Sequence, residues 1–360
     1  MDTQPGLTPL PAATPEATVA VELKTIPLIN YALQQNDMPL VLGLRLTNQR
    51  PEALEEVTLA FSSEPDFARP HELRLARLEP GETHEVGLLD LPLSHDWLAG
   101  LTERLVGTLR LEVRAGAELL ATVSQRLDLF AYDEWPGSRI FPEALAAFVT
   151  PNHPGIERLL AEATDWLGRW TGDHSLAGYQ DGDPQRVMQL VAAIYLVLQQ
   201  RGLRYINPPA SFESMGQKIR TAERLLENRL GTCLDLAVLF ASCLEQAGLH
   251  PLIIIIEGHA FAGWWLLPQT FADASTEDPL RLRKRLELDE LVLLETTALT
   301  SPEPVPFERA VEEGRRHLKQ LERFTCVVDI QRARMARIRP LPLRTERPAG
   351  AAATTAPTAP

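Results

Sequence analysis

The hydrophobic period of this chain changes near residue 132, and no other feature of the sequence constrains the fold as strongly. Before that point apolar and polar residues alternate, as at Leu42, Leu44 and Leu46, and a period of two is typical of strands with one buried face. After the segment Tyr132 to Gly137, apolar residues recur at helical spacing. The sequence therefore predicts two domains of different fold class.

The N-terminal domain is predicted to be an antiparallel β-sandwich of the immunoglobulin-like type. Turn-forming segments such as Pro80-Gly81 and Ala115 to Ala117 separate its alternating runs, and short strands at such intervals are typical of sandwiches. We place this domain at residues 19–135. Residues 1–18, which are rich in Pro, Thr and Ala, are predicted to be a disordered leader. The further alternating runs are Val57 to Phe61, Leu73 to Leu75 and Leu109 to Val113.

The C-terminal domain, at residues 136–339, is predicted to have a mixed α+β fold. The run Leu252 to Ile256 ends in four consecutive isoleucines, which indicates a central strand covered on both faces. Asp183 and Pro184 indicate a helix start, as N-cap and first helical residue. Residues 340–360 are predicted to be a disordered tail. The other predicted elements are helices at 156–170, 221–227, 233–247 and 307–324, and strands at 259–267, 291–297 and 326–330.

Composition excludes several classes of function. The chain has 360 residues and a net charge of −13, which disfavours direct binding to nucleic acid or to membrane surfaces. The sequence shows no signal peptide, and no apolar stretch approaches the roughly 20 residues that span a bilayer, so we expect a cytoplasmic protein. Its three cysteines, Cys233, Cys243 and Cys326, lack the paired spacing of disulfide frameworks and structural zinc sites. We expect no metal and no cofactor.

Cys233 is the candidate nucleophile. The segment Gly231-Thr232-Cys233 is predicted to begin a helix, with Thr232 as cap and Asp235 in the first turn. A cysteine reacts as the thiolate, which a helix N-terminus or a neighbouring imidazolium favours. We expect Cys233 at the exposed end of this helix, whereas Cys243, further along it, is predicted to be a buried core residue.

Three other side chains are candidates for the same site. His259 follows on the next predicted strand and is the candidate base, and Glu295, at the end of a buried strand, is the candidate acid that orients the imidazole. Gln217 is a weaker candidate, as a second donor to an oxyanion beside the backbone N–H of Cys233. Cys233, His259 and Glu295 also have ordinary structural interpretations, as a buried inert thiol, a core histidine and a carboxylate paired with an arginine, respectively.

The order of these motifs resembles the transglutaminase-like core, a papain-related family. That family has Gly-x-Cys at a helix start, then His-Ala-aromatic on a strand, and an acid at the end of the next strand. The resemblance implies Cys233 as nucleophile, His259 as base and Glu295 as orienting acid. The chain departs from the family in having Glu in place of Asp and Thr296 in place of Pro. The matching segments are Leu225 to Ala237, Leu244 to Pro251, Gly258 to Phe261 and Glu295 to Thr297.

Most of the chain also resembles the N-terminal region of large bacterial multidomain proteins in which a superfamily-one DNA helicase and a nuclease-like segment follow. This resemblance implies a helicase or nuclease protein as a partner in an assembly. The chain has no Gly-x-x-x-x-Gly-Lys-[Ser/Thr] string, so no ATPase activity is expected of it. The matching segments are Val21 to Lys24, Ala131 to Trp135, Asn207 to Phe212 and Val328 to Arg334.

The sequence thus favours a thiol acyl-transfer enzyme of the cysteine protease, deamidase or transglutaminase type. A Cys-His-Glu triad would act on a protein or peptide substrate through a thioester. The alternative is a catalytically inactive transglutaminase-like scaffold or protein-interaction module, associated with a DNA helicase or defence system. Sequence leaves both hypotheses open, because they differ in the geometry around Cys233.

Overall fold

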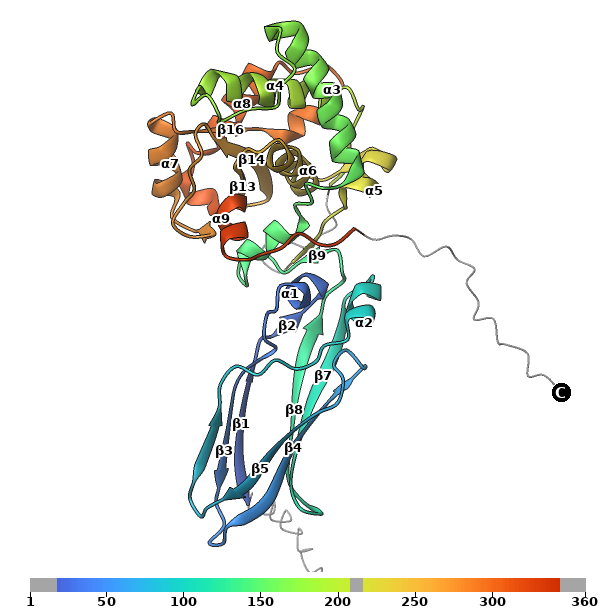
Figure 1. Cartoon of the computed structure of the whole chain (residues 1–360), viewed down its shortest axis with the longest axis vertical. Helices are drawn as coiled ribbons and strands as arrows, with labels where there is room; N and C mark the ends of the chain where they lie inside the picture. The colour runs from blue at the N-terminus through green and yellow to red at the C-terminus, as the bar shows by residue number, and fades with distance from the viewer. Residues whose placement is uncertain (1–17, 208–215, 344–360) are drawn as a thin grey trace, which may run out of the picture. The chain divides into compact units, whose positions relative to one another are not determined.

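The computed structural model describes residues 18–207 and 216–343, within two compact units, Met1–Tyr132 and Asp133–Pro360 (Figure 1). The units divide where the hydrophobic period changes, three residues before the predicted boundary at residue 135. The predicted leader, except for residue 18, and the predicted tail after residue 343 lie outside the described residues, as does most of the segment 207–212. In the described part of the chain, no helix is long and apolar enough to cross a membrane.

The N-terminal unit contains two β-sheets. Strand β1 of the smaller sheet lies against β8 of the larger one. Neighbouring strands are antiparallel except for a short parallel pair between β2 and β8. The smaller sheet has the order β1(Val19–Thr25)-β3(Val41–Asn48)-β6(Thr83–Val86) and the larger has the order β2(Leu28–Ile29)-β8(Glu118–Leu129)-β7(Leu105–Ala115)-β4(Leu54–Glu64)-β5(His71–Leu78). The helices of this unit are α1(Tyr31–Gln35) and α2(His95–Gly100).

The alternation predicted for these strands places many of their apolar residues inside, but Leu42 departs from it. Leu44 and Leu46 on β3 are buried, but Leu42 on the same strand is exposed. The reason is a break in register: Lys24 pairs with Gly43, whereas Thr25 pairs with Val41. Leu42 is therefore the extra residue of a bulge, which reverses the face that its side chain occupies.

The C-terminal unit is built around a five-stranded antiparallel sheet. The isoleucine-rich strand β13(Pro251–Ile256) is its middle strand and is buried along its whole length, as predicted. The sheet has the order β15(Ser275–Thr276)-β17(Phe324–Asp329)-β13-β14(His259–Trp265)-β16(Leu291–Leu294). The mixed α+β composition predicted from the sequence is therefore confirmed.

Two apolar cores account for the doubly covered sheet. The first core combines α3(Pro154–Thr171), α4(Pro184–Gln199) and α6(Cys233–Gln246) with Trp264 of β14. The second combines α7(Pro279–Glu287) with residues that include Ile254 and Trp265. Figure 1 shows α6 beside β13 and β14. Trp264 and Trp265 are both buried, so neither lines an open cleft.

Helix α8(Phe307–His317) ends earlier than predicted, because the sequence had indicated a helix as far as residue 324. Leu318, which follows the helix, is buried in the second core, and Phe324 already pairs with Ile256 at the edge of β13. The chain must leave the helix to make both contacts. The remaining short elements are η1(Pro142–Phe148), α5(Ala222–Asn228), η2(Thr296–Thr300), η3(Leu321–Arg323), α9(Ile330–Met335) and the strand pairs β9(Glu134–Trp135) with β11(Gln217–Lys218) and β10(Arg204–Tyr205) with β12(Leu230–Gly231).

Gly314 lets α8 lie directly on the backbone of β16. A Cβ at this position would come within 2.7 Å of the carbonyl carbon of Leu293 and of the backbone nitrogen of Leu294. Glycine lowers the intrinsic stability of a helix interior by about 1 kcal/mol relative to alanine, so close packing must offset that cost. The backbone N–H of Glu295 donates to the carbonyl of Ala310 at 2.9 Å, which fixes the end of β16 to α8.

Replacing Ile254 with alanine is expected to lower the free energy of unfolding by about 2–5 kcal/mol, because a fully buried side chain would leave a cavity in the central strand. Urea denaturation followed by tryptophan fluorescence measures this change. The exposed Leu280 is the matched control, and its replacement by alanine should change the free energy by less than about 0.5 kcal/mol. Equal losses in both variants would contradict the proposed core.

Candidate functional site

Helix α6 begins at Cys233, as the sequence predicts, and a reciprocal cap holds its first turn. The Thr232 hydroxyl accepts from the backbone N–H of Asp235 at 3.2 Å, and the Asp235 carboxylate accepts from the backbone N–H of Thr232 at 2.9 Å. The same carboxylate accepts from the backbone N–H and the guanidinium of Arg220, at 2.8 and 2.9 Å. Asp235 is completely buried, so these donors compensate for the loss of hydration. The position of Cys233 is therefore well determined.

Cys233 is buried, contrary to the expectation that it lies at the exposed end of the helix. Only 5% of the residue is accessible to solvent. Tyr205 lies against it, because Tyr205 pairs with Gly231 through the parallel bridge between β10 and β12. Burial, together with the charge of Cys233 and a hydrogen bond to its thiol, raises the pKa of the Tyr205 hydroxyl to about 12. The tyrosine therefore stays neutral beside the thiol.

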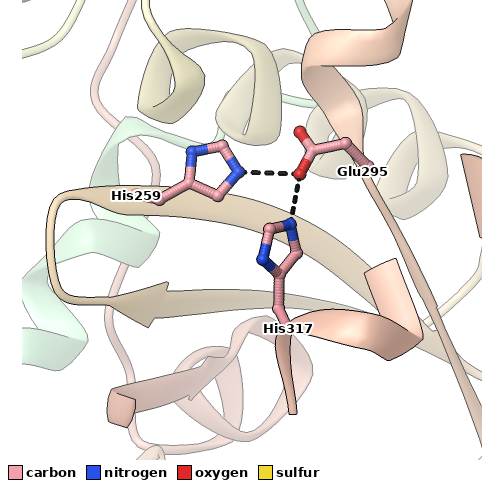
Figure 2. Close-up of side chains that lie close together, drawn as sticks. All are labelled: His259, Glu295 and His317. Carbon is pink, nitrogen blue, oxygen red and sulfur yellow. Dashed lines mark hydrogen bonds and ion pairs between the residues drawn. The ribbon is translucent and has the colours of Figure 1, made fainter. Parts of the chain in front are cut away.

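His259 lies next to the thiol at the first residue of β14. A tight turn at Gly258, with a φ of 73°, joins β13 to β14 and pairs His259 with Ile256. His259 Nε2 lies 2.7 Å from Glu295 Oε2 (Figure 2). The Cys233 thiol lies close enough to the imidazole to raise the pKa of His259. Because Nε2 is engaged by the carboxylate, Nδ1 is the nitrogen available for proton exchange with the thiol.

Glu295 is a buried carboxylate with donors on both oxygens. It follows β16 and caps η2, where Oε1 accepts from the backbone N–H and the hydroxyl of Thr297 at 2.8 and 2.7 Å. Oε2 accepts from His259 at 2.7 Å and from His317 at 2.6 Å (Figure 2). Burial alone would raise the pKa of Glu295, but hydrogen bonds from the two imidazoles and Thr297 and the charge of His259 hold it well below its ordinary value. The carboxylate is therefore ionised.

His317 is the member of the site that the sequence did not indicate. It is the last residue of α8, and its ring lies 5.0 Å from that of His259 and 4.8 Å from that of Phe261, measured between centroids. Because a carboxylate only accepts, both imidazoles donate their Nε2 hydrogen to Glu295. The sequence predicts an amphipathic helix to residue 324, and His317 would lie in its interior. The helix instead ends at His317, where the imidazole reaches Glu295.

The environment of His259 favours its protonated form. Burial alone would lower the pKa of His259, but hydrogen bonds with Cys233 and Glu295 and the negative charges of these groups raise it to about 9. The other two thiols have no such partner: burial raises the pKa of Cys243 and of Cys326 to about 12. The structure thus places one thiol beside an imidazole, whereas the other two are buried thiols whose pKa is raised chiefly by burial.

Gln217 lies near the start of α6 but makes only a long contact there. Its side-chain amide donates to the Thr232 hydroxyl at 3.4 Å, and the residue is buried on β11. This position puts the amide beside the cap of the helix that carries Cys233. The structure therefore brings Cys233, His259 and Glu295 together, with Gln217 at the edge of the group.

Glu295→Gln is expected to lower the pKa of His259 from about 9 toward its ordinary value of about 6.5. A neutral amide no longer attracts the imidazolium, so deprotonation becomes easier. Titration of the histidine ring signals by NMR measures the shift. Glu290→Gln is the control, since Glu290 pairs with Arg285. An unchanged His259 pKa in the Glu295 variant would contradict the described pairing.

No protein-family profile matches the chain, and no curated protein matches it. Matching solved structures include an exo-chitosanase of Amycolatopsis orientalis, with a TM-score of 0.22, 12% identity, and coverage of 62% of this chain and 31% of that one. Another is a family 76 glycoside hydrolase from a bovine Bacteroides thetaiotaomicron strain, with a TM-score of 0.17, 7% identity, and coverage of 72% and 55%. The chain spans about a third of the length of the first of these proteins. Similarity at this level supports no statement about fold or function.

Proposed function

We propose that the C-terminal unit is a thiol acyl-transfer enzyme that uses Cys233, His259 and Glu295 as a triad. One observation carries this proposal: the Cys233 thiol lies close enough to the His259 imidazole to raise its pKa, and Nε2 of that imidazole lies 2.7 Å from the ionised carboxylate of Glu295. A nucleophile, a base and a group that orients the base are the three parts that such catalysis requires.

We also propose finer fold assignments for both units. Two sheets with mutually facing strands support an immunoglobulin-like β-sandwich at the N-terminus. In the C-terminal unit, the nucleophile begins a helix, the base lies on the strand after next, and the acid ends a later strand of the same sheet. This order supports a transglutaminase-like, papain-related domain.

In the proposed reaction Nδ1 of His259 takes the thiol proton, which gives the Cys233 thiolate and the imidazolium that the neighbouring negative charges favour. The Cys233 sulfur then bonds to the carbonyl carbon of a carboxamide or peptide, and the carbonyl oxygen becomes an oxyanion. Backbone N–H groups at the start of α6 and the Gln217 amide are available donors there. His259 returns the proton to the leaving nitrogen as the C–N bond breaks, which releases ammonia or an amine and leaves a thioester.

The thioester is then released to an acceptor that His259 deprotonates. Water as acceptor gives a protease or a deamidase and regenerates the thiol with a free carboxylic acid. An amine as acceptor gives a transglutaminase and forms a new amide. The substrate in each case is a protein or peptide. Throughout, Glu295 keeps the His259 ring in one orientation and stabilises the imidazolium.

A second candidate function is an inactive scaffold or protein-interaction module, and the burial of Cys233 favours it. A thiol that is 5% exposed and lies against Tyr205 must be uncovered before any carbonyl can reach it. In this case the unit would serve an assembly, such as one with a helicase or nuclease protein. The two candidates differ in whether Cys233 reacts in the native protein.

Alkylation by iodoacetamide at pH 6 distinguishes them. If His259 acts as the base, Cys233 should react faster than Cys243 and Cys326, and His259→Ala should slow its reaction by about 100-fold, the lower end of the contribution of a general base. Peptide mapping by mass spectrometry measures the rate at each thiol. His174→Ala is the matched control, because His174 is exposed and packs on Gly168 of α3.

Equal labelling of the three thiols would argue against activation by His259. If Cys233 is unreactive in the native chain but becomes reactive in Tyr205→Ala, covering by the tyrosine is what prevents reaction, and the scaffold interpretation gains support. Circular dichroism spectra of all variants should match that of the unaltered protein, so that unfolding does not explain the labelling.

A further inference from the structure

Three potential metal ligands converge at Nε2 of His259. His259 Nε2, Glu295 Oε2 and His317 Nε2 all lie within 4.8 Å of one another. Figure 2 shows both imidazoles directed at the same carboxylate oxygen. The three side chains come from the start of β14, the residue after β16, and the end of α8. Such convergence from three separate elements does not follow from the proposed triad, which requires only one of the two histidines.

The distances allow a metal ion to take the place of the two imidazole hydrogens that point at Glu295 Oε2. The imidazole nitrogens lie 2.7 and 2.6 Å from Oε2. Imidazole and carboxylate ligands bind zinc at about 2.0–2.2 Å, which places neighbouring ligand atoms about 3.3 Å apart in a tetrahedral site. Each nitrogen would move from the oxygen by roughly half an ångström or slightly more, and small side-chain rotations achieve this.

The surroundings already hold the ligands in the orientation that a metal site needs. Thr297 engages Oε1 of Glu295 through two hydrogen bonds, so Oε2 remains directed at the histidines. The His317 ring packs on Phe261, with 4.8 Å between centroids. Outer-shell contacts of this kind fix the orientation of ligands in metal sites. The His317 side chain is 30% exposed, so the group can be reached from solvent on the side of this histidine.

We propose that His259, Glu295 and His317 bind a divalent zinc ion as a three-ligand site that excludes the Cys233 sulfur. The ligand group does not include Cys233, and the metal would bind Nε2 of His259, which leaves Nδ1 for the thiol. Two imidazoles and one carboxylate form a ligand set that zinc accepts, with the fourth position open to water. The sequence predicts no metal here, because the third ligand, His317, is expected to lie inside a helix that continues to residue 324.

Zinc at this position would inhibit the proposed thiol chemistry, and this part of the inference rests on the proposed function. A neutral imidazole that binds a metal through Nε2 carries its hydrogen on Nδ1. That nitrogen then has no lone pair with which to accept the thiol proton. Bound zinc would therefore remove the base without touching the nucleophile.

Calorimetric titration of the chelator-treated, full-length protein with Zn²⁺ tests the site directly. We expect one ion per chain for the unaltered protein and for Cys233→Ala. His317→Gln should lose this binding, since glutamine still donates a hydrogen bond to Glu295 but is a poor zinc ligand. Thr297→Val should weaken it by about 10- to 100-fold, as for other outer-shell contacts. His174→Gln is the control and should bind as the unaltered protein does.

Alkylation of Cys233 in the presence of Zn²⁺ tests the consequence. We expect zinc to slow the reaction in the unaltered protein, a chelator to restore it, and His317→Gln to be insensitive to zinc. Absence of binding in the calorimeter would overturn the site. Loss of binding in Cys233→Ala, or equal inhibition in His317→Gln, would also overturn it, because the thiol would then be a ligand.

The zinc site and the proposed function can fail separately. If Cys233 does not react in any variant, the thiol chemistry fails, yet calorimetry still reports whether the three ligands bind zinc. If Cys233 reacts through His259 but no zinc binds, the triad stands without this form of inhibition. Retained folding of His317→Gln, checked by its thermal melting, ensures that a lost ligand rather than a lost fold explains the result.

Discussion

The arrangement of the candidate site depends on one buried anion, the carboxylate of Glu295. Removing a carboxylate from water is costly unless hydrogen bonds replace its hydration. Here four donors do so: two from Thr297 and one each from His259 and His317. Because these donors come from η2, β14 and α8, the carboxylate adds side-chain contacts among three elements that backbone hydrogen bonds already bring together at the end of β16. The imidazole beside Cys233 takes its orientation from this group.

Much of the fold could be predicted because its signals are local. The cap at Thr232 and Asp235 fixes the start of α6 within a few residues of sequence, and the isoleucines of β13 identify a strand covered on both faces. Part of the candidate triad could also be predicted from the sequence. A carboxylate at the end of a buried strand needs a partner, and in the structure that partner is His259.

The remaining features depend on contacts between distant parts of the chain. His317 could not be identified as a partner of Glu295 from the sequence, because the predicted helix continued to residue 324. In the structure α8 ends seven residues earlier, at His317. The burial of Cys233 depends on Tyr205, which is brought to it by a two-residue parallel bridge that no period reveals. At Leu42, a bulge set by pairing with β1 reversed the predicted alternation. Strand register and helix termination of this kind are decided by tertiary packing, which outweighs local preference.

The glycine at position 314 has a consequence for when the site can exist during folding. Helix α8 is short and contains a residue that weakens it, so it gains its stability from docking on β16 rather than from its own sequence. The end of β16, where Glu295 lies, is in turn fixed by the backbone bond to Ala310 of that helix. A nascent chain that has folded only as far as His259 would hold the thiol and the imidazole without the anion that aligns them. The candidate site therefore forms only after the chain beyond residue 310 has been made and has packed, so the proposed thiol chemistry would begin only when the unit is nearly complete.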